Sequence, residues 1–384
     1  MNKVEELIAK LCPNGVKYKK LEECCNILDS KRRPVTKSAR QYGEYPYYGA
    51  NGIQDYVSDY IFDGTYVLVG EDGSVINDRG NPIVIWAQGK IWVNNHAHVI
   101  SEIKNVSLRY LYHYIQSINI SNLIHGNIPK LNQGDFRKLK IPVPPIEVQN
   151  EIVQILDKFT ELEAELEAEL EARKKQYEFY KENLLKNKNN IKKLKEVADI
   201  YDSLHSTPKY VNEGYPMVRV ADIKSGYVNT ENTLKVDKKT FIKFIQKYKP
   251  KENDIIISRV GSYGNVCIVN KEEICLGQNT SIIHPKINKK YLYYYLSSSN
   301  VQNWIKCNVN GAGYKSLSLA NINEIPINVP EIKEQEHIVN ILDRFDKLCN
   351  DISEGLPAEI EARRKQYEYY RDKLLNFKEI NKNE

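Results

Sequence analysis

Hydrophobic side chains recur with a seven-residue period near the middle of the chain. Ile152, Phe159 and Leu166 are spaced by seven, and the period resumes at Leu170 and Tyr177 after a four-residue step. A sustained seven-residue repeat predicts a long helix with one apolar stripe, and the added step predicts a stutter in that stripe. Tandem L-E-A-E units supply the step, and their residue types favour helix strongly.

This helical stretch occurs twice. Val143–Phe159 reads V-P-P-I-E-V-Q-N-E-I-V-Q-I-L-D-K-F, and Val329–Phe345 reads V-P-E-I-K-E-Q-E-H-I-V-N-I-L-D-R-F. Each copy closes alike, with E-A-R-K-K-Q-Y-E-F-Y at Glu171–Tyr180 and E-A-R-R-K-Q-Y-E-Y-Y at Glu361–Tyr370. A repeat this long indicates two large modules, each with its own long helix.

The second copy contains Gly355 and Pro357, which predict a kink or break in its helix. If the two apolar seams pack on each other, the helices run antiparallel as a coiled coil, which gives the chain an approximate two-fold symmetry. The residues expected in this seam are Ile152, Phe159, Leu162, Leu166, Leu170, Tyr177, Ile338, Phe345, Leu348, Ile352 and Tyr367.

The segment before the first helix mixes strand and helix patterns. Residues 61–71, 82–88 and 90–100 are rich in β-branched and aromatic side chains, which predicts strands. Residues 108–117 have helical spacing, and 126–131 predict an exposed loop. The segment is therefore a mixed α/β domain.

A similar order returns in the second half without close identity. Residues 253–258 and 277–283 predict strands, 291–296 a helix, and 311–319 a loop, with Leu131 and Leu317 separated by the same 186 residues as the helices. The expected fold class is α+β, with two α/β domains separated by two long antiparallel helices. The boundaries are a domain at 1–142, a helix at 143–188, a domain at 189–328 and a helix at 329–384.

The net charge of +5 is unevenly distributed. Both globular segments are net positive and both helices are net negative, which favours polyanion binding by the domains and protein contacts by the helices. An ordinary solvated surface remains the alternative. No apolar run approaches about 20 residues, and seven cysteines lack any C-x-x-C, so we expect a cytoplasmic protein.

Familiar catalytic motifs are missing from the sequence. There is no G-x-x-x-x-G-K-[ST] phosphate loop, and the single Pro-Pro pair follows Val143 and not the polar residue that amino-methyltransferases need. His96 and His98 alternate beside Asn94 and Asn95, but further metal ligands cannot be placed. We interpret these four as DNA-contacting or structural polar residues, and we expect no metal and no catalytic residue.

Cations interleaved with tyrosine and amide side chains suit nucleic acid, because cations meet phosphates while amides and Arg read base edges. For each residue the alternative is an ordinary surface or core role. In the first domain the candidates are Lys31, Arg32, Arg33, Lys37, Arg40, Tyr47, Tyr48, Asn51, Asn94, Asn95, His96 and Lys130. In the second they are Lys209, Arg219, Lys224, Arg259, Ser262, Tyr263, Asn265, Gln278, Asn279, Tyr314 and Lys315.

The paired helix motifs, with the K-L and S-L loops before them, resemble the specificity subunit of type I restriction-modification enzymes. The resemblance implies two target recognition domains, each reading half of a split double-stranded DNA site, and helices that separate them. It also implies docking of two methyltransferase subunits and, through them, restriction subunits. S-adenosylmethionine, ATP and Mg are expected in those partners and not in this chain.

Two other classes remain open from the sequence. A coiled-coil scaffold with protein-binding domains has the same helix pattern, but its affinity for duplex would be weak and nearly independent of salt. A self-sufficient DNA-modifying enzyme is disfavoured by the missing motifs, and methyl transfer by the single chain would support it.

Overall fold

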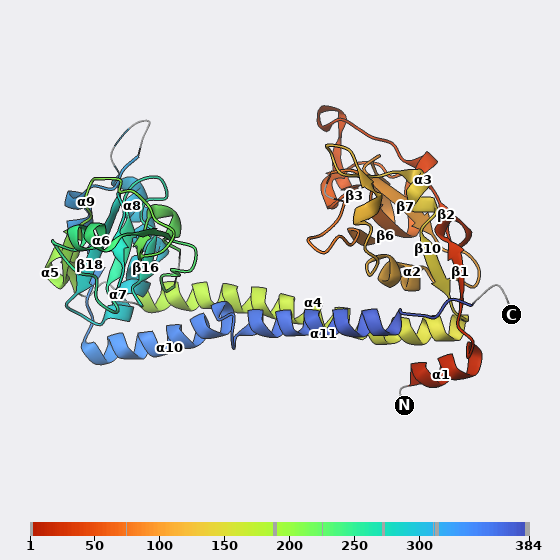
Figure 1. Ribbon diagram of the computed structural model, residues 1–384. Helices are drawn as coiled ribbons and strands as arrows, with labels where there is room; N and C mark the ends of the chain where they lie inside the picture. Colours follow the sequence, from red (N-terminus) through yellow and green to blue (C-terminus); the bar gives the residue numbers. More distant parts are fainter. Residues whose placement is uncertain are drawn as a thin grey trace. The chain divides into compact units, whose positions relative to one another are not determined.

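The computed structural model describes residues 3–73, 75–186, 190–224, 226–270, 273–309, 311 and 315–380 (Figure 1). The chain divides into two compact units. Unit 1 comprises residues 1–167 with 359–384, and unit 2 comprises residues 168–358. This division differs from the expected one because each unit includes part of the long helices. Among the described residues, no helix is both long enough and apolar enough to span a membrane.

Unit 1 is built on a six-stranded sheet in the order β2-β7-β5-β6-β3-β4. All neighbours pair antiparallel except β3 and β6, which are parallel. The strands are β2 (Asn26–Ile27), β3 (Tyr42–Gly49), β4 (Gly52–Val57), β5 (Phe62–Gly70), β6 (Val84–Val93) and β7 (Ala97–Ser101). Two small pairs join β1 (Lys17–Lys20) to β10 (Lys140–Val143) and β8 (Ile124–His125) to β9 (Lys130–Leu131).

The helices of unit 1 share one apolar core with residues of β5 and β7. They are α1 (Lys3–Leu11), α2 (Leu108–Ile115), α3 (Gln133–Arg137), the first part of α4 (Ile146–Leu185) and most of α11 (Leu356–Leu374). Short 3-10 turns are η1 (Leu21–Glu23), η2 (Asp29–Lys31), η3 (Lys37–Ala39) and η4 (Ser121–Leu123).

Unit 2 repeats the central strand order. Its four-stranded antiparallel sheet runs β12-β18-β15-β16, which matches β2-β7-β5-β6 strand for strand. These strands are β12 (Ala198–Asp202), β18 (Thr280–Pro285), β15 (Ile255–Ser258) and β16 (Val266–Ile268). The units differ beyond that core, since unit 2 has a separate three-stranded sheet of β14 (Leu234–Val236), β13 (Tyr215–Val218) and β17 (Cys275–Leu276).

The remaining elements of unit 2 follow the same plan. Strand β11 (Ile191–Lys193) pairs with β19 (Pro326–Asn328), as β1 pairs with β10. The helices are α5 (Leu194–Val197), α6 (Lys238–Phe244), α7 (Lys289–Leu296), α8 (Ser299–Cys307), α9 (Leu319–Asn323) and α10 (Ile332–Asn350), with the 3-10 turn η5 (Val220–Asp222).

Long helices pack in antiparallel pairs inside each unit. In unit 1 the Phe159 ring stacks on Tyr370 with centroids 5.4 Å apart, and Glu163 further along α4 pairs with Arg364 earlier in α11. In unit 2 the rings of Tyr177 and Phe345 lie 6.1 Å apart. The prediction of a break in the second helix is confirmed, because α10 ends at Asn350 and α11 begins at Leu356.

Three of the residues expected in the seam are exposed. Ile352 is 85% exposed, because it lies beyond the end of α10, where the helical period no longer applies. Leu162 is 45% exposed, since the four-residue step at L-E-A-E turns the apolar stripe around the helix. Leu348 is 37% exposed in the last turn of α10. Ile152, Tyr177, Ile338 and Tyr367 are buried, and Phe159, Leu170 and Phe345 pack partly buried against the two cores. Leu166 is half-buried.

The predicted strand boundary at Gly89 was wrong. Gly89 lies inside β6, opposite Gly64 of β5, and both glycines take positive φ so that the pairing continues without a break. The chain turns instead between Val93 and Ala97, where the Asn94 side chain accepts a hydrogen bond from the His96 N–H at 2.8 Å. An asparagine that bonds its own backbone two residues on favours a turn.

Equivalent polar contacts fix a helix of each domain to the long helix below it. In unit 1, Asp157 of α4 accepts hydrogen bonds from Arg109 and His113 of α2, both at 2.7 Å. In unit 2, Asp343 of α10 lies 2.6 Å from both Lys290 and Tyr294 of α7.

The glutamine of the V-P-x-I-x-x-Q repeat makes the same contacts in both units. The Gln149 and Gln335 side chains each accept from the N–H at the start of α2 or α7, and each donates to a proline carbonyl of its own repeat. Both side chains are buried, which explains why glutamine occupies this position in both copies.

Candidate nucleic-acid interface

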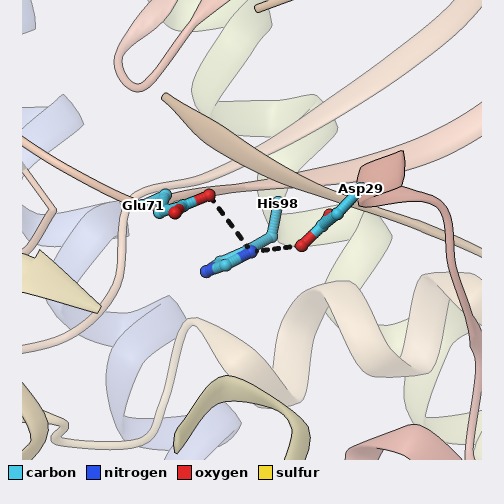
Figure 2. Close-up of side chains that lie close together, drawn as sticks. All are labelled: Asp29, Glu71 and His98. Carbon is cyan, nitrogen blue, oxygen red and sulfur yellow. Dashed lines mark hydrogen bonds and ion pairs between the residues drawn. The ribbon is translucent and has the colours of Figure 1, made fainter. Parts of the chain in front are cut away.

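A buried charged cluster lies at one end of the unit 1 sheet. Asp29 follows β2, Glu71 follows β5, and His98 lies on β7 between them. Figure 2 shows one imidazole nitrogen, Nδ1, facing both carboxylates. It is 2.7 Å from Asp29 Oδ2 and 3.6 Å from Glu71 Oε2. The other nitrogen, Nε2, is 3.0 Å from the Leu131 carbonyl.

Both imidazole nitrogens of His98 face oxygen atoms that only accept hydrogen bonds. The Phe136 ring stacks on this imidazole at 4.2 Å and shields it from water. The cluster therefore combines two carboxylates with a buried imidazole.

Two cations complete the cluster. Arg32 Nη1 lies 2.5 Å from Glu71 and 2.7 Å from the Ala97 carbonyl, while Lys130 Nζ lies 3.2 Å from Glu71. The ligand atoms of Asp29, Glu71 and His98 lie within 4.8 Å of one another, a spacing that would suit a metal ion. The arginine and lysine already supply the positive charge there, so ion pairs account for the arrangement.

Hydrogen bonds keep Asp29 ionised although it is buried. Burial alone opposes the charged form. The His98 imidazole, the Val99 N–H and the Arg32 guanidinium outweigh that effect, and the pKa of the Asp29 carboxyl is lowered from its usual value.

Unit 2 has an equivalent cluster at the matching end of its sheet. Asp202 ends β12, Arg259 follows β15, and Ser281 lies on β18. Arg259 Nη1 is 2.5 Å from Asp202, its Nε is 3.1 Å from the Leu317 carbonyl, and Ser281 Oγ is 3.2 Å from Asp202. Burial opposes ionisation of Asp202, but the Arg259 guanidinium and His205 prevail, and its pKa is lowered.

The candidate residues of unit 1 fall into two groups. Arg32, Arg40, Tyr47, Tyr48 and Asn94 are half-buried or buried and bonded within the unit; Arg40 pairs with Asp55 at 3.2 Å and lies over the Tyr47 ring. Lys130 is half-buried. Those that are exposed are Lys31, Arg33, Lys37, Asn51, Asn95 and His96.

The candidate residues of unit 2 fall into the same two groups. Arg259 is engaged by Asp202, Arg219 pairs with Asp222 at 3.1 Å, and Tyr263 and Asn279 are half-buried. Tyr314 lies outside the described residues. The exposed candidates are Lys209, Lys224, Ser262, Asn265, Gln278 and Lys315. Contact with DNA stays a prediction for every one of these residues.

Sequence reasoning missed the acidic residues of both clusters. A search for phosphate-binding cations has no reason to select Asp29, Glu71 or Asp202. Their partners lie far away in the sequence, since Asp29 and His98 are 69 positions apart, so strand pairing had to be known first. The available signal in the sequence was that Leu131 and Leu317 occupy the same position before the two proline runs, which marks the two loops as equivalent.

The fold defines a class of protein in which two related α+β modules each pack on a pair of long antiparallel helices. The family model for the type I restriction modification DNA specificity domain matches residues 13–172 and again 186–362. The chain therefore belongs to the type I restriction-modification DNA specificity family. Members of this family are non-catalytic components that recognise DNA sequence, and the resemblance found in the sequence is confirmed.

Relatives of known sequence and structure agree with this assignment. A Haemophilus influenzae protein named as a type I restriction enzyme specificity subunit is 38% identical over 377 residues, which is 94% of this chain and 96% of that protein. The Escherichia coli EcoR124I/EcoR124II specificity subunit is 33% identical over 288 residues, covering 70% of this chain and 71% of its own.

A solved structure has the same fold. The crystal structure of the type I restriction-modification S subunit from M. genitalium matches with a TM-score of 0.57 at 16% identity, covering 94% of this chain and 96% of that one. At this identity the match shows the fold alone, which is the expected α+β class with two domains.

Proposed function

We propose that each unit reads one half of a split, asymmetric site in double-stranded DNA. The observation that carries this proposal is the repeated strand order, which places loops of unlike sequence at the same end of each central sheet. Equal frameworks with different side chains suit two unlike half-sites, because base edges are distinguished by the side chains that meet them.

The exposed residues beside the buried clusters have the chemistry for this role. Asn95 and His96 in unit 1, and Gln278 in unit 2, offer donors and acceptors to base edges. Exposed cations such as Lys37 and Lys315 suit phosphates, which position a protein on the duplex without selecting a sequence. The internal ion pairs of Arg32 and Arg259 favour a supporting role for these two side chains.

We also propose that two methyltransferase subunits dock on the long helices and bring restriction subunits with them, in the cytoplasm. The sequence repeat places Phe179 of α4 and Tyr369 of α11 in equivalent positions, and both are 64% exposed. Exposed aromatic side chains often anchor protein interfaces. S-adenosylmethionine, ATP and Mg would bind to those partners, and the target base would flip into a methyltransferase pocket.

Reconstitution with the methyltransferase subunits tests this function. The complex should methylate a bipartite sequence, and replacing one unit with that of a relative should change one half of the sequence and leave the other intact. Methylation mapping by long-read sequencing measures this. A complex that methylates without sequence preference, or a replacement that alters both halves, would contradict the proposal.

Salt dependence separates this function from that of a protein-binding scaffold. Binding through phosphates releases counterions, so duplex affinity should fall by about a thousandfold or more between 50 and 200 mM salt. Weak affinity that hardly changes with salt would favour the scaffold.

A further inference from the structure

The two charged clusters occupy the same place in the two units. Val69 of β5 pairs with His98 of β7, and Ile257 of β15 pairs with Ser281 of β18. Glu71 directly follows the last residue of β5 that pairs with β7. Arg259 directly follows the last residue of β15 that pairs with β18. The positions match, but the side chain that contacts the aspartate comes from β7 in unit 1 and from the residue after β15 in unit 2.

In both units, the backbone of the residue after the strand links two loops. The Glu71 N–H donates to the His96 carbonyl, and the Glu71 carbonyl accepts from the Leu131 N–H, both at 2.8 Å. In unit 2, Arg259 makes the same two bonds with Asn279 and Leu317, also at 2.8 Å. Each linked pair of loops carries predicted DNA-contacting residues, including His96, Lys130, Asn279 and Lys315.

A ring or guanidinium nitrogen then contacts the same carbonyl in each unit. His98 Nε2 donates to the Leu131 carbonyl at 3.0 Å, and Arg259 Nε donates to the Leu317 carbonyl at 3.1 Å. Each of these side chains is held in turn by an aspartate, Asp29 in the turn after β2 or Asp202 at the end of β12. Two different side chains thus make equivalent contacts in the two units. This indicates that the contact to the carbonyl was kept while the residue type that makes it changed.

We propose that His98 and Arg259 are positioning residues for half-site reading, each fixing the loop stem at Leu131 or Leu317 beside the bases. The inference rests on the proposed function. Neither side chain needs to touch DNA. Loss of either one should therefore reduce discrimination among bases in the half-site of its own unit and leave the salt dependence of binding nearly unchanged.

The experiment compares His98→Gln with Arg259→Gln in the reconstituted complex. Methylation rates are measured on the cognate duplex and on duplexes with one base pair changed in either half-site. Each variant should lose about tenfold or more of its discrimination in the half-site of its own unit and keep the other. Arg259→Lys, which retains a cation, should restore much of that discrimination.

Circular dichroism of each purified complex shows whether the variant has folded. If His98→Gln fails to fold, the comparison of Arg259→Gln with Arg259→Lys still tests the inference in the half-site of unit 2. Unchanged discrimination in folded variants, or equal losses in both half-sites, would overturn the inference. A wild-type complex without sequence preference would instead overturn the proposed function.

Discussion

At the scale of single residues, most of the arginines predicted to contact DNA are bonded within the protein. Arg32, Arg40 and Arg259 each face a carboxylate from a different part of the chain. A buried or half-buried guanidinium needs such a partner, because removing charge from water without compensation is costly. Composition reveals the cations, but tertiary pairing decides which of them remain available to a ligand.

Asp157 is the residue whose removal should most directly affect how α2 is held on α4. Burial opposes its ionisation, but hydrogen bonds from His113 and Arg109 prevail and lower the pKa of its carboxyl. A lowered pKa means that its contribution is present above about pH 4, the unfolded value, and is lost as pH falls through the folded value.

We predict that Asp157→Asn lowers the free energy of unfolding by about 1–3 kcal/mol at neutral pH. Urea unfolding over a pH series measures this. The difference from wild type should shrink at acid pH, where the wild-type carboxyl is also neutral. Glu161→Gln, at an exposed position of the same helix, is the control and should match wild type. A difference that persists unchanged in acid would contradict the assigned cause.

At the scale of secondary-structure elements, local sequence predicted the helices better than the strands. The break between α10 and α11 was expected from Gly355 and Pro357 and is present. The division of β6 from β7 was misplaced, because paired glycines let a strand continue where a turn was expected. Strand limits depend on partners that are remote in sequence, whereas a helix is set by its own residues.

Gly355 should be required for the break between these helices. A Cβ atom there would lie 2.6 Å from the carbonyl oxygens of Lys347 and Asp351, which are backbone atoms and cannot easily move. We predict that Gly355→Ala destabilises unit 2 by about 1–3 kcal/mol. Thermal unfolding measures this. Gly134→Ala is the matched control, since a Cβ at that position meets nothing within 4 Å; equal effects of the two substitutions would contradict the prediction.

At the scale of the whole molecule, duplication followed by divergence explains the chain. Each unit keeps the same four-strand order and the same glutamine contacts, while the β3–β4 hairpin of unit 1 has no counterpart among the strands described in the central sheet of unit 2. Helix α4 contributes residues to both units. A deletion within α4 therefore changes the length of a helix that belongs to both units.

We predict that deleting one L-E-A-E unit, Leu162–Glu165, changes the gap between half-sites and leaves both half-site sequences intact. The deletion shortens α4 by about 6 Å and adds about 40° of rotation. The next L-E-A-E unit takes the deleted positions, so local side-chain contacts are preserved. Leu162→Ala keeps the length and serves as control. Methylation mapping reads the gap, and an unchanged gap would refute the role of the helix as a spacer.

The sequence by itself determined the duplication, the long helices, the break at Gly355 and the family. These features are encoded locally: periodicity, helix-forming residues and glycine or proline act within a few turns of chain. The motif shared by the two helices was specific enough to identify the family.

Only the tertiary structure decided which polar residues work together. Asp29 and His98, like Asp202 and Arg259, meet because antiparallel strands bring distant residues into register, and nothing local marks them as partners. Burial then separates the cations that hold loops in place from those left exposed to solvent. The physical reason is that strand pairing and desolvation are long-range properties, which local sequence does not contain.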